Sequence, residues 1–330
     1  MRNITLIRGA RQLLTLRGSP GPRRGADLQN LGMIPAGAVL IAGGEILEVG
    51  PSRRIENLAL ARNAQEIDAS GCVVLPGFVD CDVHVVQDGQ ERSPRALTLF
   101  GLRAVEEAIR CGTTAMEAKS EPGLSIPGAM KVLRVHATLR QLPFTFVSTI
   151  VTPGDALFAM PRARRLADFA ELAPDNAAAL AKARQFGWEI KLRAAPGQAD
   201  DAITTLTPIV PFLADQSLAS ARGMIDNGAA VALASGAAPA NMQTVIALAC
   251  GVMNLTAAEA ISAATINGAH AIGRAYGVGS LEAGKSADLV ILGVPDYREL
   301  PYHLGVNLAN VVMIQGSVRV ERSSVKWPEP

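Results

Sequence analysis

An aspartate and a histidine, Asp82 and His84, stand two residues apart at the end of one apolar segment, residues 73–84. Residues two apart on a β-strand point to the same face, so both side chains could reach one metal ion. Carboxylate oxygen and imidazole nitrogen both bind zinc, and a zinc that activates water usually has three protein ligands and one open position. The pair is therefore either part of a metal site or the polar, hydrogen-bonded end of a strand.

Other residues that could carry chemistry have simpler structural explanations. Cys81 should face away from Asp82 and His84, because adjacent strand residues point to opposite faces, and we expect it not to be a nucleophile. Lys119 is expected to pair with its neighbour Glu117 rather than to be an active-site lysine. The remaining histidines are expected to be structural: His136, His270 and His303. The sequence contains no phosphate-binding glycine loop, and its four scattered cysteines form no C-x-x-C pair.

The composition is that of a protein with a large aliphatic core. Of 330 residues, 49% are hydrophobic and 18% charged, and the net charge is +1. Lys and Arg are not clustered, which argues against nucleic acid or an anionic membrane as a partner and favours small molecules or proteins. The first residues lack the apolar stretch of a signal peptide and no apolar run reaches about 18 residues, so we expect a cytoplasmic protein.

Strand patterns lie at both ends of the chain. Residues 38–41 and 45–49 flank Gly43-Gly44 and predict a hairpin. Residues 287–292 and 310–313 predict two more strands, and Gly316 turns the chain into another at 317–320. Since each end alone has too few strands to bury a face, we expect both ends to form one small β-domain.

The middle of the chain alternates short strands with alanine-rich helices, which is an α/β pattern. The expected helices are residues 97–110, 127–140, 176–186, 219–227 and 242–253. The expected strands are residues 73–84, 115–119, 144–150, 188–192, 206–210 and 230–233. Six strands are fewer than the eight of a closed (β/α)₈ barrel, so we expect a barrel with unpaired edges between residues 148 and 230 and oligomerisation as the remedy.

Several motifs resemble one enzyme family. Residues 74–81 (VLPGFVDC) resemble the first barrel strand of amidohydrolases, which normally continues into His-x-His, and residues 279–291 (GSLEAGKSADLVI) resemble the return of those enzymes to their β-sandwich. More specific similarity to imidazolonepropionase lies in three stretches: residues 11–16 (RQLLTL), 112–120 (GTTAMEAKS) and 294–307 (VPDYRELPYHLGVN). The resemblance implies a protein related to enzymes that hydrolyse the ring C–N bond of imidazolone propionate with zinc or iron.

The resemblance also implies where functional residues should stand, and most are changed. Arg193 stands where the next histidine ligand is expected, Gly236 replaces the ligating aspartate, and the segment with the catalytic histidine has no counterpart. Pro122 replaces the tyrosine of a substrate-binding S-G-Y-G-L motif, and Arg92 lies one position from the family's substrate arginine.

The sequence thus predicts an amidohydrolase-like (β/α) barrel, either complete or incomplete, over residues 76–279, and a composite β-sandwich from residues 1–75 and 280–330. The favoured hypothesis is a catalytically impaired imidazolonepropionase-like protein with no cofactor, which binds a small molecule or assembles with itself or with an intact relative. The alternative is an active C–N hydrolase with a reduced metal site at Asp82 and His84. A third hypothesis is a decaying sequence without a selected role.

Overall fold

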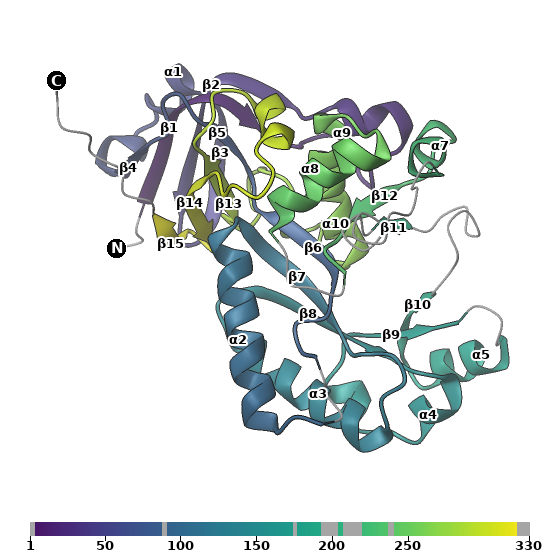
Figure 1. Ribbon diagram of the computed structural model, residues 1–330. Coiled ribbons are helices and arrows are strands. Elements are labelled where there is room, and N and C mark those ends of the chain that lie inside the picture. The colour runs from purple at the N-terminus through teal and green to yellow at the C-terminus, as the bar shows by residue number, and fades with distance from the viewer. Residues whose placement is uncertain are drawn as a thin grey trace.

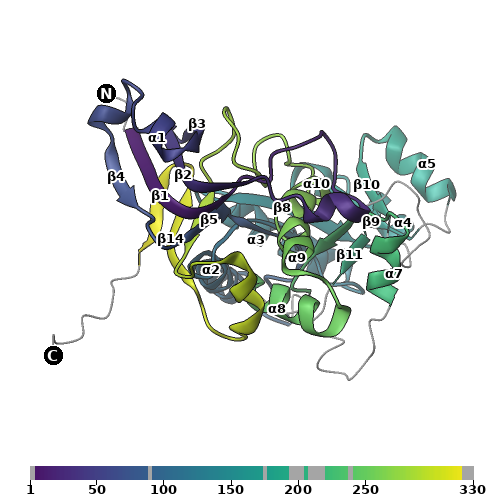
Figure 2. The same ribbon diagram turned by 90° about the horizontal axis from the view of Figure 1, so that it is seen from above.

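The structure is a computed structural model that describes residues 4–87, 91–173, 177–192, 204–206, 220–236 and 241–321. It contains a β-rich part at one end and an α/β part at the other (Figures 1 and 2). None of the helices within these ranges is long and apolar enough to cross a membrane.

Strands from both ends of the chain are hydrogen-bonded in one sheet of eight strands, in the order β15-β14-β13-β5-β1-β2-β3, with β4 beside β1. The strands are β1 (Ile4–Leu14), β2 (Met33–Ala42), β3 (Glu45–Pro51), β4 (Gln65–Asp68), β5 (Val73–Pro76), β13 (Leu289–Leu292), β14 (Ala309–Ile314) and β15 (Ser317–Glu321). The hairpin of β2 and β3 lies where the sequence predicted it. The exact domain boundaries stay a prediction.

This sheet rolls up around its own hydrophobic core. The backbone N–H of Ala287 donates to Gly44 O at 2.9 Å, and that of Gly316 donates to Ala287 O at 3.1 Å. Ala287 thus connects the turn between β2 and β3 with the turn between β14 and β15. Gly44 and Gly316 have φ values of 89° and 70°, a region that glycine adopts without strain. Side chains from both chain ends fill the interior, including Ile7, Val39, Val74, Leu289 and Met313.

The second part is built from parallel strands and helices. Five strands pair in the order β10-β9-β8-β7-β6, and two more form the pair β11-β12. Their bounds are β6 (Phe78–Val83), β7 (Thr113–Lys119), β8 (Thr145–Val151), β9 (Phe169–Leu172), β10 (Glu189–Leu192), β11 (Thr204–Leu206) and β12 (Val231–Leu233). A parallel bridge between Val83 and Gly236 brings the chain after β12 beside β6.

Helices follow the parallel strands. They are α2 (Pro94–Arg110), α3 (Ile126–Leu139), α4 (Gly154–Phe158), α5 (Ala177–Gln185), α7 (Ser220–Asp226), α8 (Met242–Met253), α9 (Ala257–Ala263) and α10 (Ile266–Ala271), while α1 (Ser52–Ile55) follows β3. Short 3₁₀ turns are η1 (Gly25–Gln29), η2 (Ala61–Asn63), η3 (Ala163–Arg165) and η4 (Tyr297–Tyr302). Ser93 and Ser125 start α2 and α3 by accepting hydrogen bonds from backbone N–H groups of the first turn.

Two details of the predicted strands were wrong. The segment 73–84 is not one strand: Gly77 divides it into β5, which joins the rolled sheet, and β6, which joins the parallel sheet. A Cβ at Gly77 would lie 2.1 Å from Thr114 Oγ1, so only glycine fits where the chain changes sheets. The sequence pattern also missed three strands, β1, β4 and the four-residue β9. The predicted strand 206–210 falls mostly outside the described residues.

The parallel strands surround a shared core, and within the described residues they form two separate sheets. Val79, Ala115, Val147, Phe169 and Ala232 pack together from β6, β7, β8, β9 and β12, which bends the strands around one interior. In the described part of the chain, β10 pairs with β9 alone and β11 with β12 alone. The predicted unpaired edges between residues 148 and 230 and the predicted oligomerisation stay predictions, because much of this segment lies outside the described residues.

Candidate active site

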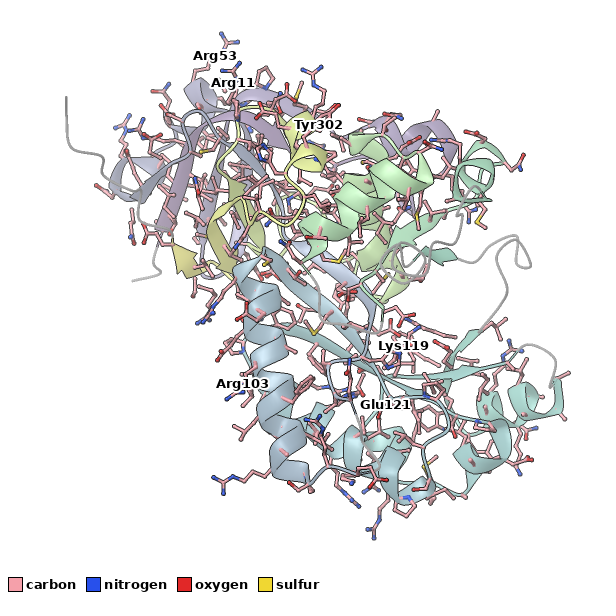
Figure 3. The ribbon with its side chains drawn as sticks, viewed as in Figure 1. Arg11, Arg53, Arg103, Lys119, Glu121 and Tyr302 are labelled. Carbon is pink, nitrogen blue, oxygen red and sulfur yellow. The ribbon has the colours of Figure 1, made fainter. Side chains whose placement is uncertain are left out.

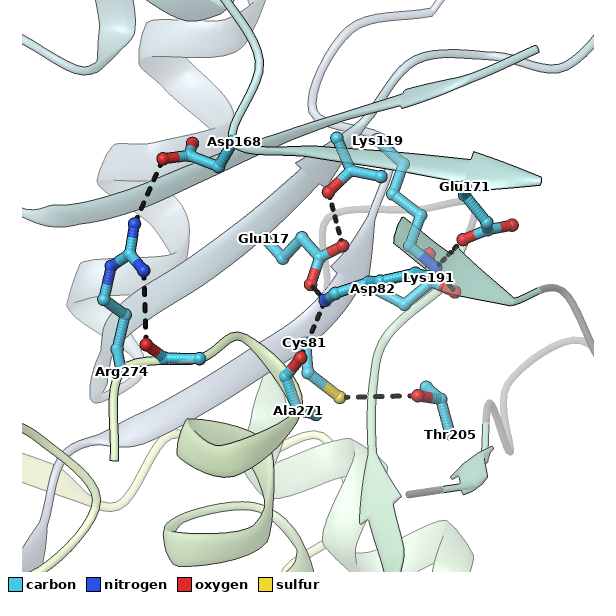
Figure 4. Close-up of polar contacts among 12 residues, drawn as sticks. Cys81, Asp82, Glu117, Lys119, Asp168, Glu171, Lys191, Thr205, Ala271 and Arg274 are labelled. Carbon is cyan, nitrogen blue, oxygen red and sulfur yellow. Dashed lines mark hydrogen bonds and ion pairs between the residues drawn. The ribbon is translucent and has the colours of Figure 1, made fainter. Parts of the chain in front are cut away.

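Charged side chains converge at the carboxyl ends of the parallel strands, where barrel enzymes carry their active sites (Figure 4). Asp82 comes from β6, Glu117 and Lys119 from β7, Glu171 from β9 and Lys191 from β10. We call these five residues the ion network. Lys119 lies toward the middle of the molecule, whereas Arg103 points outward from α2 (Figure 3).

The ammonium of Lys119 bridges two carboxylates. Its Nζ lies 2.8 Å from Asp82 Oδ2 and 2.6 Å from Glu171 Oε2. The three side chains are 11%, 22% and 8% exposed, so little water screens them. Burial alone would lower the pKa of Lys119, but Asp82, Glu117 and Glu171 outweigh burial and raise that pKa, so Lys119 is charged at neutral pH.

Glu117 forms the second half of the network. Its side chain is fully buried, forms an ion pair with Lys191 and accepts a hydrogen bond of 2.7 Å from Thr149 Oγ1 on β8. Lys191 also donates to Ala271 O at 2.7 Å and lies 4.5 Å from the centre of the Phe169 ring. The expected ion pair between Lys119 and Glu117 is therefore wrong, because Glu117 is directed at Lys191 and Lys119 is held by Asp82 and Glu171.

Gly236 lies beside the Asp82–His84 segment. Gly236 N donates to Asp82 O at 2.9 Å, and His84 N donates to Gly236 O at 3.2 Å. The contact is made entirely by backbone. His84 Nδ1 is buried and has no hydrogen-bond partner within the described residues. The carboxylate of Asp82, in contrast, accepts a hydrogen bond from Lys119 Nζ.

Asp80, which sequence reasoning did not single out, is the most perturbed acid of the strand. Its carboxylate is fully buried and accepts hydrogen bonds from Ser235 N and Ser235 Oγ. Burial raises the pKa of Asp80 to about 7, although both hydrogen bonds act in the opposite direction. The sequence signal that could have identified Asp80 was an acidic residue within an otherwise apolar strand.

Cys81 is a buried core thiol. The register of β6 and β7 shifts between Asp80 and Val83, so strict alternation of side chains does not hold there. Cys81 packs with Val79 and Ala115, and its Sγ donates to Leu233 O at 3.4 Å. Burial raises the pKa of Cys81, which keeps the group as a thiol at neutral pH.

Arg92 makes its contacts with residues outside the ion network. Arg92 stacks over Phe100 with 5.5 Å between the guanidinium carbon and the ring centre, and its carbonyl accepts from Lys131 Nζ at 2.8 Å. Its assignment to substrate stays a prediction. Arg193 lies outside the described residues.

The remaining histidines occupy three separate places. His136 is buried on α3 with Nδ1 2.9 Å from Ser148 Oγ, and burial lowers its pKa to about 3. Such an imidazole is neutral at neutral pH. His270 lies in α10 and His303 directly follows η4. The structural roles expected for His270 and His303 stay predictions.

A cavity of about 360 Å³ opens at the same end of the parallel sheet. Pro122 and Gly123 form one wall, residues 151–154 at the end of β8 and directly after it form another, and residues 171–173 and Ala179 complete the lining. Glu171 thus belongs both to the cavity wall and to the ion network. The cavity sits where a small molecule would approach the strand ends.

The described residues do not fit a hydrolytic zinc or iron. No three or more His, Cys, Asp or Glu side chains among them are arranged to hold a metal. Asp82 is already ion-paired with Lys119, and Gly236 offers no side chain. His84 alone has an imidazole nitrogen without a partner at this place.

Comparison with known proteins agrees with this fold. Residues 162–321 match the model of the amidohydrolase family. Among solved structures, guanine deaminase from E. coli aligns over 98% of this chain and all of its own, with a TM-score of 0.71 and 13% identity. Ochratoxinase from A. niger also aligns with a TM-score of 0.71, at 17% identity over 97% of this chain and 96% of its own. At such low identity these likenesses define the fold, an amidohydrolase-type α/β architecture.

Sequence relatives define the group more narrowly. Imidazolonepropionase from Parabacteroides distasonis is 31% identical over 412 aligned residues, covering 95% of this chain and 98% of the relative. The imidazolonepropionase from Geobacillus kaustophilus is 32% identical over 417 residues, covering 97% and 98%. The chain belongs to the imidazolonepropionase-like members of the amidohydrolase family. Because the alignments are longer than its 330 residues, parts of these relatives have no counterpart here.

Proposed function

We propose that this protein is an imidazolonepropionase-like family member that has lost metal-dependent hydrolysis of the cyclic C–N bond, wholly or very largely. The observation that carries the proposal is the ion pair between Lys119 Nζ and Asp82 Oδ2 at 2.8 Å. The one carboxylate left in the position of the His-x-His pair is thereby neutralised by the protein itself.

The Lys119 ammonium opposes a metal ion at Asp82 and offsets the attraction of one of the nearby carboxylates. Two unit charges about 4 Å apart interact by about 4 kcal/mol at an effective dielectric constant of about 20, so a divalent ion beside an ammonium would be repelled by roughly 8 kcal/mol. Structural zinc sites bind with about 10–16 kcal/mol, so this repulsion removes a large share of the affinity. The backbone contacts of Gly236 supply no ligand in compensation.

One observation favours the alternative of a working hydrolase. His84 Nδ1 is buried without a partner in the described ranges, and a buried unpaired nitrogen costs free energy unless something binds it. A metal held by His84 and Asp82 would need displacement of Lys119 and a further ligand from elsewhere in the chain. The impaired family member and the working hydrolase make opposite predictions for one experiment.

The purified protein should contain far less than one zinc or iron per chain and should not open imidazolone propionate above the uncatalysed rate. Asp82→His should behave alike, because two imidazoles fall short of a three-ligand site and the Lys119 ammonium remains beside position 82. Elemental analysis and a turnover assay measure both. The imidazolonepropionase from Geobacillus kaustophilus, purified in parallel, is the positive control.

Tightly held metal at one per wild-type chain together with turnover would refute the proposal and establish the hydrolase. We expect the 360 Å³ cavity to bind a small molecule, and the strand edges that are unpaired within the described residues would favour assembly with another subunit.

A further inference from the structure

The end of η4 and the loop after it carry apolar side chains that are exposed to solvent. Tyr302 is 87% exposed, Leu304 55% and Val306 49%. Single exposed apolar residues are common on protein surfaces, but three within five residues form a patch. We call these three residues the apolar patch. They belong to residues 294–307, the longest of the three stretches that resemble imidazolonepropionase. A contact outside the chain would explain why they are apolar.

A groove of about 610 Å³ adjoins the apolar patch. Its walls come from η4 on one side and from α8 and the turn into α9 on the other, and these elements pack side by side (Figure 1). Cys250 and Gly251 line it from α8, and Pro301 and Tyr302 line it from η4. Tyr302 therefore belongs to both the groove and the apolar patch, so a hollow and a projection lie on one face of the molecule.

Helix α8 is uncharged on its outer side as well as on its inner side. Residues 242–253 contain no Asp, Glu, Lys or Arg. Val245 and Ile246 pack in the core, while Ala247 and Gly251 border the groove. A helix with one solvated face normally carries charged residues there, and a helix that is apolar nearly all round is covered on both sides. The composition of α8 thus indicates that the groove is covered in the assembled protein.

We propose that a second copy of this chain covers the groove across a two-fold axis, with Tyr302 of each copy in the groove of the other. A two-fold interface uses the same surface on both subunits, so it needs a projection and a hollow on one face. Tyr302 and the groove beside it supply both. The groove has the size of sites that enclose a small molecule, which leaves room for an aromatic ring.

The exposed area is of the right order for a dimer. A buried aromatic side chain contributes about 150–250 Å² on its own, so the apolar patch presents roughly 300–400 Å² at its exposed fractions. This is about half of the ~800 Å² that each partner contributes to a standard interface, and the walls of the groove add to it. The inference goes beyond the proposed function, because it locates an assembly surface and does not depend on hydrolysis.

The test measures the mass of the full-length protein by light scattering and sedimentation from low to high micromolar concentration. We expect the wild type to be a dimer. Tyr302→Asp places a charge in the centre of the interface and should raise the dimer Kd by at least about 30-fold, the effect of losing one dominant interface side chain. Tyr276→Asp is the matched control, because Tyr276 is 79% exposed beside the turns at Gly44 and Gly316, and it should leave the dimer intact.

Gly251→Arg changes the opposite wall of the groove. A Cβ at Gly251 meets nothing within 4 Å, and a cation in the last turn of α8 favours the helix, so the variant should fold as a stable monomer. An equal mixture of Tyr302→Asp and Gly251→Arg should dimerise again. In the mixed dimer the new carboxylate of one chain faces the new guanidinium of the other, and the second contact between Tyr302 and a groove is unchanged.

A wild type that stays monomeric overturns the proposal. A wild-type dimer that neither Tyr302→Asp nor Gly251→Arg weakens also overturns it, and would place assembly at another surface, such as the strand edges. A mixture of the two variants that stays monomeric overturns the pairing of Tyr302 with the groove. If Tyr302→Asp does not fold by circular dichroism, the mass of Gly251→Arg decides. Since no arm measures turnover or bound metal, these outcomes leave the proposed function to its own experiment.

Discussion

Glu117→Ala should destabilise the protein by about 3 kcal/mol, the lower end of the range for removing one partner of a buried ion pair. Glu117 is fully buried, and its loss leaves the ammonium of Lys191, which is 21% exposed, without its carboxylate. Thr149 Oγ1 loses its acceptor at the same time. Urea unfolding at neutral pH measures the change in the free energy of unfolding.

A surface pair in the same protein is the control. Glu107 and Arg110 are paired on α2 with side chains 66% and 61% exposed, and Glu107→Ala should change stability by less than about 1 kcal/mol. The double variant Glu117→Leu/Lys191→Met should be less destabilised than Glu117→Ala, because it leaves no buried charge unpaired. If Glu117→Ala and Glu107→Ala changed the free energy of unfolding equally, the buried pair would contribute no more stability than the surface pair.

Asp80 should make the protein less stable as the pH rises from about 4 to about 7. The folded-state pKa of Asp80 is raised to about 7 by burial, above its ordinary value of 3.8. Below pH 3.8 Asp80 is protonated in both the folded and the unfolded protein, and its full contribution to stability is present. Between the two pKa values only the unfolded chain releases the proton, so about 4 kcal/mol is lost by pH 7 and nothing further is lost above it.

Asp80→Asn isolates this effect, because the amide is neutral at every pH and its oxygen still accepts from Ser235 N. Its stability should lack the part of the pH dependence that Asp80 causes, so the difference between wild type and variant should grow in favour of the variant from pH 4 to pH 7. Urea unfolding at several pH values measures both curves. Parallel curves over this range would mean that the pKa of Asp80 is not raised.

Local sequence patterns predicted the elements well where the signal was local. The helix expected at residues 242–253 is α8 with the same bounds, and the hairpin around Gly43-Gly44 is present. The four-residue β9 was missed because it is too short to show a period. The division at Gly77 was missed because it depends on Thr114 from another strand.

The candidate site was only partly predictable. Asp82, His84 and Gly236 were found through the family motifs, and the structure places them side by side through backbone contacts. Their electrostatic surroundings were not predictable, because Lys119 and Asp82 are 37 residues apart and Lys191 and Glu117 are 74 apart. Such ion pairs depend on which strands become neighbours and on the curvature of the sheet. The local periodicity of the sequence predicts neither of these two features.

The position of β5 in the rolled sheet sets an order for events during protein synthesis. β5 lies between β1 and β13, so one of its edges has no partner until Leu289–Leu292 leave the ribosome, after the whole parallel sheet has been made. At 5–20 residues per second that interval is roughly 10 to 40 s. A stalled nascent chain that ends before Leu289 should therefore be cleaved by protease within residues 4–76 much faster than the released full-length protein, and equal cleavage rates would show that β5 is protected without β13.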